Sequence, residues 1–518
     1  MLVFIPMSAA LRPSNSLKPP KSVRLRWLNC GRRVLDRRRA APDNRTAEPA
    51  WPYPIFARIN RTVNEALVSH DGPGHRWLAA LGQRGMELGL QRIAALLQRL
   101  DHPERQVPVV AVAGSDGKGS TSAMLAALLQ ASGLHVGHYT SPHLSETRER
   151  VAVDGVAVTA QALDDALIVV QQASVADPPL DPTPFEALTA AALQLFAHWQ
   201  PRLDVMVLEI GLGGRLDAVN ATEPVVSVIT HLSYDHTSVL GTSLQQIAWE
   251  KAGIARDGRA LVCAQPGLIK PALRKHGITA RLLALGTELT VHHVAFAGAA
   301  LRTSAVLRGP ALADDLFIEL RQPGRHQAEN AALAVLAYLA YAEWVLAARG
   351  QALVAVDEAA LALAAVAWPL RAEVVQTDPL VVVDAAHNPA GMAALAALLA
   401  ERGKAWQVVL AVRSDRDAAE LVRALMPIAQ GFFLPRCANP TLLPAADLAL
   451  IVDQIAPACS VAVASASRCF IQAGREVGKD SGVIITGSQH ALGEWLQAGL
   501  LTSPQLQRRL GLPENAQP

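Results

Sequence analysis

The sequence predicts an α/β protein with a mostly parallel sheet, and three observations support this fold class. Short apolar runs such as DVMVLEI (204–210) and VVSVIT (225–230) alternate with helical segments, which is the pattern of parallel strands buried on both faces. The stretch VVAVAGSDGKGSTSAMLAALL (109–129) passes from an apolar strand through a glycine-rich loop into a helix. At 518 residues the chain exceeds the usual size of one hydrophobic core, so two domains are expected.

The other elements follow from periodicity and turn residues, starting near Trp51, where the sequence becomes globular in character. Helices are predicted over residues 84–100, 118–132, 159–173 and 185–199. Strands are predicted over residues 109–113, 135–139, 204–210 and 225–230. The segment 288–321 alternates more and predicts antiparallel strands. A second α/β unit begins near Arg371 and contains EVV, LVVVDAAHNPAGMAALAALLAE, WQVVLAV, GFFLP and GVIITGSQHALGEWL.

The composition is that of a globular protein with ample core. Hydrophobic residues make up 51% of the chain and charged residues 18%, and the net charge of +2 gives no general reason to expect a nucleic-acid partner. The cysteines lie scattered without CxxC spacing, which argues against metal clusters and a disulfide framework and fits a reducing cytosol. They are Cys30, Cys263, Cys437, Cys459 and Cys469. No run of about 18 uninterrupted apolar residues occurs, so we expect a cytoplasmic protein without a membrane span.

Residues 1–50 differ from the rest of the chain. Between Met1 and Ala40 there are ten lysines and arginines and a single acid, Asp36. Prolines break the short apolar fragments, so no signal-peptide core of adequate length follows the basic residues. Three interpretations compete: a basic arm for nucleic acid, an arginine-rich transit peptide, and an extension from an upstream start codon. Because nothing in this segment can bury a core, we expect a disordered, dispensable extension.

The glycine-rich loop after the strand at 109–113 indicates a phosphate site. Backbone N–H groups and a helix N-terminus meet there, Lys118 adds a mobile positive charge, and Ser120 or Thr121 can offer a hydroxyl to Mg²⁺. The pattern departs from a strict Walker A motif, because Val112 stands at the first glycine position and Gly119 follows the lysine. The alternative is an ordinary glycine-rich turn. The loop by itself does not define a reaction.

Further candidate residues follow the two apolar strands at 204–210 and 225–230. Glu209 lies near the end of the first strand, where open α/β sheets bind ligands, and could hold Mg²⁺ opposite the phosphate loop. The alternative is a helix cap or an ion pair. Asp235 and His236 follow the second strand, and we favour a ligand role for His236 over an ordinary polar contact. Lys251 lies on a short helix, where a solvated charge fits equally well, so the residues alone leave its role open.

Taken together, these motifs resemble folylpolyglutamate synthase, including its bifunctional form with dihydrofolate synthase activity, within the Mur-ligase-like superfamily. The matching stretches are LGLQR, AGSDGKGST, YTSPHL, TPFEALT, LEIGLGGRLDAVNA, DHTSVLG with IAWEKAGI, GRHQAENAALA, WPLR and DAAHNPAG. They occur in the family's order and cover roughly residues 55–500. The resemblance implies a P-loop ATPase domain over 51–367 and a smaller Rossmann-like domain over 368–518, with residues 1–50 outside both.

The resemblance also implies the nucleotide and metal sites. The ATP positions are Ser115, Asp116, Gly117, Lys118, Gly119, Ser120, Asn330, Arg371 and Asp384. One Mg²⁺ would bind Ser141 and Glu209 and a second would bind His236, while K⁺ is kept as a further candidate cation. Lys251 matches the family's carbamylated lysine, whose carboxylate-like group attracts Mg²⁺ where an ammonium would repel it. Lys118, His236 and Lys251 are the implied catalytic residues.

Substrate contacts and the reaction are implied in the same way. The pterin or folate positions are Thr183, Pro184, Phe185, Glu186, Arg215, Leu216, Asp217 and Ala218, with His387 and Asn388 on the edge where the domains close. In the family's reaction, ATP phosphorylates a carboxylate of dihydropteroate or of a reduced folate. The α-amine of L-glutamate then attacks the acyl phosphate to form an amide. Charge neutralisation by Lys118 and Mg²⁺ supplies most of the catalysis. The family further implies a monomer.

Three positions depart from the family's usual pattern. Asp116 stands where asparagine is common, and a carboxylate beside phosphate is unfavourable unless it points to Mg²⁺ or solvent. Leu370 replaces a glycine in WPLR and lacks its conformational freedom. Ala385 stands where glycine or valine is frequent. None of these changes removes a proposed ligand, so an active enzyme remains the favoured interpretation.

Three other functional classes are weighed against this interpretation. A Mur-type cell-wall ligase would be expected to lack TPFEALT and the GRLDA loop. A P-loop kinase needs neither Lys251 nor DAAHNP. A catalytically silent folate- or nucleotide-binding protein is suggested only by Asp116 and Leu370. The sequence does not decide between addition of the first glutamate and chain extension.

Overall fold

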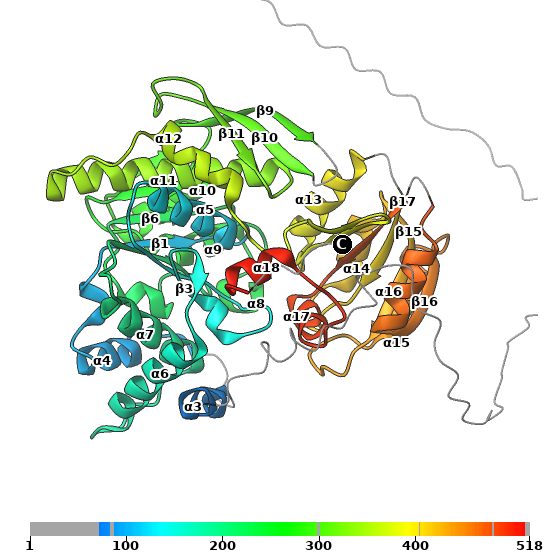
Figure 1. Cartoon of the computed structure of the whole chain (residues 1–518), viewed down its shortest axis with the longest axis horizontal. Helices are drawn as coiled ribbons and strands as arrows, with labels where there is room; N and C mark the ends of the chain where they lie inside the picture. The colour runs from blue at the N-terminus through cyan, green and yellow to red at the C-terminus, as the bar shows by residue number, and fades with distance from the viewer. Residues whose placement is uncertain (1–71, 83–86, 298–300, 403–404, 479–480, 513–518) are drawn as a thin grey trace, which may run out of the picture. The chain divides into compact units, whose positions relative to one another are not determined.

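The computed structural model describes residues 72–82, 87–297, 301–402, 405–478 and 481–512. All of these residues belong to one compact unit, Trp51–Pro518 (Figure 1). The predicted disordered extension over 1–50, with Cys30, lies outside the described residues. Part of the helix predicted over 84–100 also lies outside them.

An eight-stranded sheet forms the first half of this unit, in the order β4-β3-β2-β5-β1-β6-β7-β8. Its strands are β1 Val109–Ala113, β2 Val136–Tyr139, β3 Val151–Val153, β4 Val156–Ala157, β5 Val205–Glu209, β6 Val226–Ile229, β7 Ala260–Cys263 and β8 Arg281–Ala284. All neighbours pair in parallel except β2 with β3 and β3 with β4, which are antiparallel. The carboxyl ends of the parallel strands therefore share one edge, where ligands bind in open α/β sheets.

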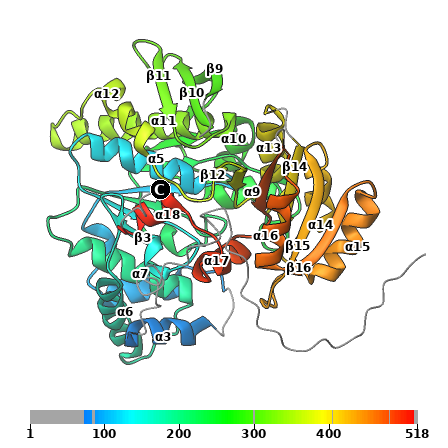
Figure 2. The same cartoon turned by 45° about the vertical axis from the view of Figure 1, so that its right-hand side comes forward.

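Helices cover both faces of this sheet (Figure 2). They are α3 Pro73–Leu81, α4 Gln91–Arg99, α5 Lys118–Ala131, α6 Ala160–Val175, α7 Pro184–Ala197, α8 Thr237–Leu240, α9 Leu244–Ala252, α10 Pro266–His276, α11 Arg325–Arg349 and α12 Val356–Ala360. Short 3₁₀ turns are η2 Pro103–Arg105, η3 Thr147–Arg150, η4 Ala218–Ala221 and η5 Leu361–Ala365. Strand β1 shows why both faces are apolar: Val110 and Val112 enter a core with α5 and α11, whereas Val109 and Ala111 enter a core with α4 and α7. The predicted parallel sheet is confirmed.

Helix α11 is long and apolar enough to cross a membrane by length and composition alone. In its most apolar 18-residue stretch, 61% of the residues are buried inside the protein, among them Leu333, Leu336 and Tyr338. It packs against α5 and the sheet. This burial is what a core helix of a globular domain shows.

A small antiparallel sheet follows, as the alternation over 288–321 predicts. Its order is β11-β10-β9. The strands are β9 Thr290–Ala297, β10 Arg302–Arg308 and β11 Leu316–Leu320. In β11 every second residue is buried, so one face packs on the core and the other faces solvent.

The second α/β unit holds a six-stranded sheet in the order β12-β13-β17-β14-β15-β16. All pairs are parallel except β12 with β13. The strands are β12 Glu373–Thr377, β13 Leu380–Val383, β14 Ala405–Leu410, β15 Ala429–Arg436, β16 Ser460–Ser465 and β17 Ser481–Thr486. The helices are α13 Pro389–Ala400, α14 Ala418–Leu425, α15 Ala445–Ile455, α16 Ala466–Arg475, α17 Gln489–Gln497 and α18 Pro504–Arg509. The α/β fold class with two sheets is confirmed, while the boundary at 367/368 stays a prediction.

Candidate active site

The phosphate loop, residues 114–117, connects β1 to α5 at the carboxyl edge of the large sheet. A side chain at Gly114 would place its Cβ 1.8 Å from Thr230 Oγ1, and Gly117 has a φ of +85°, so both positions require glycine. The N–H groups of Ser115 and Asp116 donate to the carbonyl of His231 at 2.8 and 3.1 Å. They are therefore committed to the chain beyond β6. The donors left for a phosphate belong to the N-terminus of α5, where the first N–H groups lack helical partners.

Lys118 begins α5 and folds back over the loop. Its Nζ donates to the carbonyls of Gly114 and Ser115 at 3.1 and 3.2 Å. Ser120 is buried in the first turn of α5. The predicted loop-and-lysine arrangement is thus present, with the ammonium held beside the helix N-terminus.

The Asp116 carboxylate is hydrogen-bonded on both oxygens within the protein. Its Oδ1 accepts a hydrogen bond from Asn388 Nδ2 at 2.9 Å, and its Oδ2 accepts one from the Ser233 hydroxyl. Asn388 also caps α13, because its Oδ1 accepts from Gly391 N at 2.7 Å. The unusual carboxylate therefore connects the phosphate loop to the second α/β unit.

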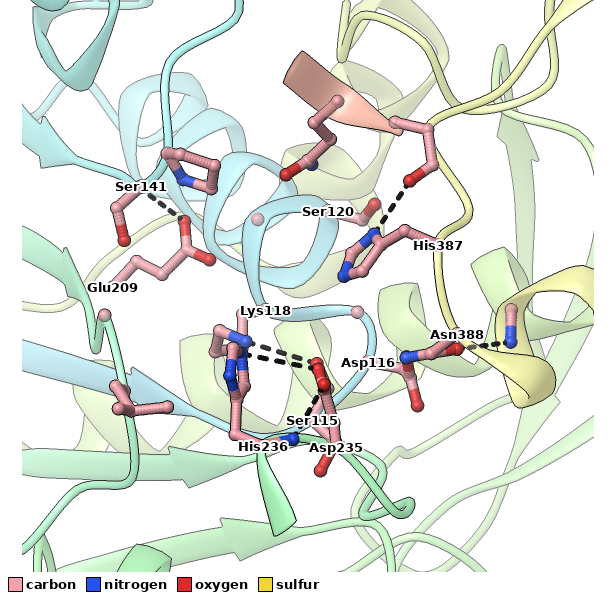
Figure 3. A pocket seen from close by; sticks show the side chains of 18 of the residues that line it. Ser115, Asp116, Lys118, Ser120, Ser141, Glu209, Asp235, His236, His387 and Asn388 are labelled. Atoms are coloured by element: carbon pink, nitrogen blue, oxygen red, sulfur yellow. Dashed lines mark hydrogen bonds and ion pairs between the residues drawn. The ribbon is translucent and has the colours of Figure 1, made fainter. Parts of the chain in front are cut away.

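Glu209 and Ser141 meet beside the loop, as predicted for a metal site. Glu209 ends β5 and is buried, and its Oε2 accepts from Ser141 N at 3.2 Å (Figure 3). Burial raises the pKa of Glu209, while the charge of Lys118 opposes that rise. His236 follows β6 with a φ of +50°. Burial lowers the pKa of His236, which favours the neutral imidazole that binds metals.

Lys251 lies beneath the phosphate loop on α9. It is buried, and its Nζ donates to the Gly114 carbonyl at 2.8 Å, the same carbonyl that accepts from Lys118. Burial, and then the charge of Lys118, lower the pKa of Lys251 to about 7. The solvated-charge alternative is therefore wrong. A buried lysine that is partly neutral near pH 7 can act as a nucleophile toward CO₂.

The second α/β unit contributes residues to the same place. Asp384 follows β13, and its two oxygens accept from Ala372 N at 2.7 Å and Ala386 N at 2.6 Å. Burial raises the pKa of Asp384, and the charge of Arg371 opposes that rise.

The first half of the protein adds Asn330, from α11. It lies so close to the phosphate loop that a Cβ on Gly117 would be 2.2 Å from its Oδ1.

A cavity of about 820 Å³ brings most of the predicted residues together. Those that line it are Ser115, Asp116, Gly117, Lys118, Gly119, Ser120, Ser141, Thr183, Pro184, Phe185, Glu186, Glu209, Leu216, Asp217, Ala218, His236, Asn330, Arg371, Asp384, His387 and Asn388. Arg215 and Lys251 are absent from the described residues that line it. Arg215 instead stacks over the ring of Trp249, 4.5 Å from its centroid, and pairs with Glu250 at 2.9 Å. A direct substrate contact by Arg215 would require it to leave these partners.

Several predicted substrate residues are also held by structural bonds. Thr183 and Glu186 form a capping box at the start of α7, and Arg92 Nε donates to Glu186 Oε2 at 3.1 Å. Asp217 caps η4, and burial raises the pKa of Asp217 to about 6. Phe185 presents its ring to the cavity near Tyr139.

Arg416 and His326 are two of the cavity-lining residues that were not predicted from the sequence. Arg416, before α14, forms an ion pair with Asp235. Burial alone would raise the pKa of Asp235, but the hydrogen bond from Arg416 and the charges of His236 and Arg416 together more than offset it, so the net pKa lies below its ordinary value. His326 is enclosed, and burial lowers the pKa of His326 to about 4. No local pattern marks the Asp235–Arg416 pair, whose members lie 181 positions apart.

The residues in the cavity fit a Mg²⁺ ion that is also bound by water and phosphate better than they fit a metal bound only by protein side chains. Within the described part of the chain no three His, Cys, Asp or Glu side chains group closely enough to hold an ion. Mg²⁺ usually keeps several waters and binds one or two carboxylates together with substrate phosphates. A buried carboxylate beside a phosphate loop, as at Glu209, is such a site.

A phosphate loop, a buried carboxylate and lysine, and a second α/β unit that contributes to the same cavity define an ATP-dependent ligase of the Mur type. Comparison with known families agrees. Residues 112–338 match the Mur ligase middle domain, and residues 370–489 match the Mur ligase glutamate ligase domain.

Relatives narrow the class. The chain is 32% identical over 387 residues to the Bacillus subtilis dihydrofolate synthase/folylpolyglutamate synthase, covering 72% of this chain and 86% of that one. It is 34% identical over 390 residues to the Mycobacterium tuberculosis protein of the same name, covering 70% and 77%. The chain belongs to the dihydrofolate synthase/folylpolyglutamate synthase family of ligases, so the predicted resemblance is confirmed.

Solved structures are similar along nearly their whole length. The Mycobacterium tuberculosis folylpolyglutamate synthase complexed with ADP has a TM-score of 0.74 at 29% identity, covering 84% of this chain and 99% of that one. A bifunctional folylpolyglutamate synthase/dihydrofolate synthase with Mn, AMPPNP and L-glutamate bound has a TM-score of 0.70 at 29% identity, with coverages of 84% and 99%. These relatives bind a nucleotide, and one binds a divalent metal.

Proposed function

We propose that this ligase adds L-glutamate to dihydropteroate, to reduced folates, or to both, through an acyl phosphate. The names of the relatives, and the L-glutamate in one solved complex, support this substrate class. The observation that carries the proposal is the cavity itself, in which the phosphate loop and Glu209 face Arg371 and Asp384 of the second unit. A further part of its wall is apolar and includes Phe185 and Leu216.

In the proposed reaction the residues of the loop hold and neutralise phosphate. The N-terminus of α5 and the ammonium of Lys118 would bind the γ-phosphate, so that the substrate carboxylate can approach it. Two Mg²⁺ ions, one bound by Ser141 and Glu209 and a second by His236, would supply further charge neutralisation. Arg371 and Asp384 would close the nucleotide site from the other side and exclude water from the acyl phosphate.

Lys251 is proposed to act as a carbamate. Its neutral amine would attack CO₂, forming an N–C bond and releasing one proton. The product carries a negative charge beside the phosphate loop in place of a cation. The pKa of about 7 for Lys251 supports this step, because about half of the side chain is neutral near that pH.

The proposal also covers the cellular compartment and the oligomeric state of the enzyme. We place it in the cytoplasm as a monomer, with K⁺ as a further candidate cation. The free thiols of Cys263, Cys437, Cys459 and Cys469 in the described part of the chain support a reducing compartment. The argument that Asp116 favours a catalytically silent nucleotide-binding protein is weakened, because both of its carboxylate oxygens accept hydrogen bonds from the protein.

The test is an assay with ATP, Mg²⁺, L-glutamate and either dihydropteroate or tetrahydrofolate. We expect one ADP and one phosphate for each amide formed, and the substrate that reacts decides between first addition and chain extension. Transfer of phosphate without an amide would instead indicate a kinase.

Lys118→Ala should abolish ligation while the fold is kept, because the ammonium that neutralises the phosphate is lost. Circular dichroism checks the fold, and the amide assay checks activity. Activity of this variant close to that of the wild type would overturn the assignment of the loop.

A further inference from the structure

The C-terminal helix α18, Pro504–Arg509, packs against chain segments that flank the candidate active site, although it lies beyond the matched glutamate ligase domain, which ends at residue 489. It lies beside β3 and β4 of the first half of the unit in both views (Figures 1 and 2). Two chain segments meet it there. One is the linker, residues 368–373, and the other is the turn after β2 that carries Ser141.

Arg509 provides the bonds to the turn. Its Nη2 donates to Thr140 Oγ1 at 3.0 Å and to the Glu149 carbonyl at 2.7 Å, and its Nε donates to the same carbonyl at 3.2 Å. The side chain is 6% exposed, and the neighbouring Thr140 is 3% exposed. Thr140 directly precedes Ser141, so the guanidinium fixes the backbone from which a proposed metal ligand projects.

The same guanidinium lies over the linker. Its central carbon is 4.6 Å from the ring centroid of Trp368. Trp368 in turn packs against the first turn of α5, where a Cβ on Gly119 would lie 2.6 Å from its ring. Arg509 therefore joins the Ser141 turn, the linker and the phosphate-binding helix through two buried side chains.

The start of α18 holds the other end of the linker. Gln505 Oε1 accepts from Trp368 N at 2.7 Å. Glu373 is buried, and its carboxylate accepts from Leu370 N, the Ser503 hydroxyl and Gln505 N at 3.0, 2.7 and 3.0 Å. These bonds satisfy a carboxylate that burial would otherwise make costly.

We propose that α18 is a clasp that sets the linker and the Ser141 turn against the phosphate-binding helix, and that Arg509 is the positioning residue through which it acts. The clasp rests on the proposed function, because the metal role of Ser141 does. It predicts that nucleotide and Mg²⁺ binding depend on a helix outside the matched domains.

Arginine suits this position for a physical reason. Its planar fork donates to two acceptors at fixed angles while its face stacks on an aromatic ring, which an ammonium cannot do. Removing the donors leaves the Glu149 carbonyl and Thr140 hydroxyl without these partners. A support of this kind typically changes metal affinity or activity by about 10–100-fold.

The test measures binding of AMPPNP to the full chain by calorimetry at several Mg²⁺ concentrations, with thermal unfolding measured alongside. We expect Arg509→Met to bind AMPPNP about tenfold more weakly and to need several-fold more Mg²⁺. Arg509→Lys should recover part of this loss, because it keeps the charge over Trp368. Arg508→Met, which removes a charge from the same helix, serves as the matched control and should bind as the wild type does.

The outcomes separate the clasp from a general effect on stability. If Arg509→Met lowers the melting temperature but binds AMPPNP with wild-type affinity and Mg²⁺ dependence, the clasp is wrong. If that variant does not fold, Gln505→Leu carries the test, with a smaller loss in the same direction expected and an unchanged affinity counting against the clasp. A wild type that binds AMPPNP but forms no folate amide overturns the proposed substrate, while these variants still decide the clasp.

Discussion

The two sides of the phosphate loop carry acidic side chains that are held in opposite ways. On one side Asp116 accepts hydrogen bonds on both oxygens, from Asn388 and from Ser233. On the other side Glu209 lines the cavity, and from the described residues it accepts a single hydrogen bond, from Ser141 N. Each oxygen of Asp116 already has a neutral donor, whereas Glu209 keeps more of its acceptor capacity for a cation. We therefore expect Glu209, rather than Asp116, to bind the metal.

The sharpest test of this comparison is Glu209→Gln, for which we expect the largest effect. The amide keeps the size and the bond from Ser141 but loses the charge that would hold Mg²⁺. Ligation should fall about 100-fold or more at fixed Mg²⁺. The rate of amide formation against Mg²⁺ concentration checks this. A variant that reaches the wild-type rate at the wild-type Mg²⁺ concentration would remove Glu209 from the metal site.

Lys251→Arg should reduce the rate of ligation nearly as much, by about 100-fold. Arginine keeps the positive charge but cannot form a carbamate, so a cation would remain beside the loop. Amide formation and the mass of the intact protein in bicarbonate measure the two consequences. For the wild type, carbamylation should increase as the pH rises through the pKa of about 7, because the neutral amine reacts. Activity that is indifferent to CO₂ depletion, together with an active arginine variant, would contradict the carbamate.

Arg416→Met tests the side of the loop that faces the second α/β unit. We expect an intermediate effect, a loss of folding stability. It leaves Asp235, 8% exposed, without its ion-pair partner, and breaking a buried pair costs roughly 3–5 kcal/mol. The folded-state pKa of Asp235 is held low, so the pair contributes stability above the ordinary aspartate range that is lost as the pH falls. The destabilisation should thus be largest at neutral pH and shrink below about pH 4. Chemical denaturation at pH 7 and at about pH 2 measures it, and an equal loss of stability at both would exclude this origin.

Asp116→Asn should have the smallest effect. An asparagine can still accept from Asn388 and exchange a hydrogen bond with Ser233, so we expect stability to change by about 1 kcal/mol or less. The Mg²⁺ dependence of ligation should not move. A large rise in the Mg²⁺ requirement would show that Asp116 binds the metal after all, and the contrast with Glu209 would be lost.

Four strands of the large sheet, β1, β2, β5 and β6, were predicted from their apolar runs, whereas β3, β4, β7 and β8 were not. The run over 109–113 coincides with β1, and those over 204–210 and 225–230 contain β5 and β6. Strand β16 was missed, because Ser460–Ser465 is only partly buried and lacks such a run. Helices α14, α15 and α16, which lie between β14 and β17 in the chain, were not predicted either.

The candidate site was predictable only where its residues form motifs. Lys118 and Glu209 stand in recognisable stretches at strand ends. The orientation of Asp116 could not be predicted, because its partner Asn388 is 272 positions away and no local pattern sets that pairing. The same holds for Arg509, whose bonds cross about 360 positions. Such contacts depend on tertiary packing.

The linker turn at Leu370 has a consequence for the order of folding. Leu370 has a φ of +54° and is fully buried, among residues that include Val383, Ile485 and Leu506. Left-handed backbone costs a leucine roughly 1–2 kcal/mol, whereas burying its side chain contributes roughly 2–5 kcal/mol, so packing outweighs strain. A glycine turn could form by itself, but this turn needs its core. We therefore expect the linker to acquire this shape only when Leu370 is packed in its core, which includes Leu506 of α18.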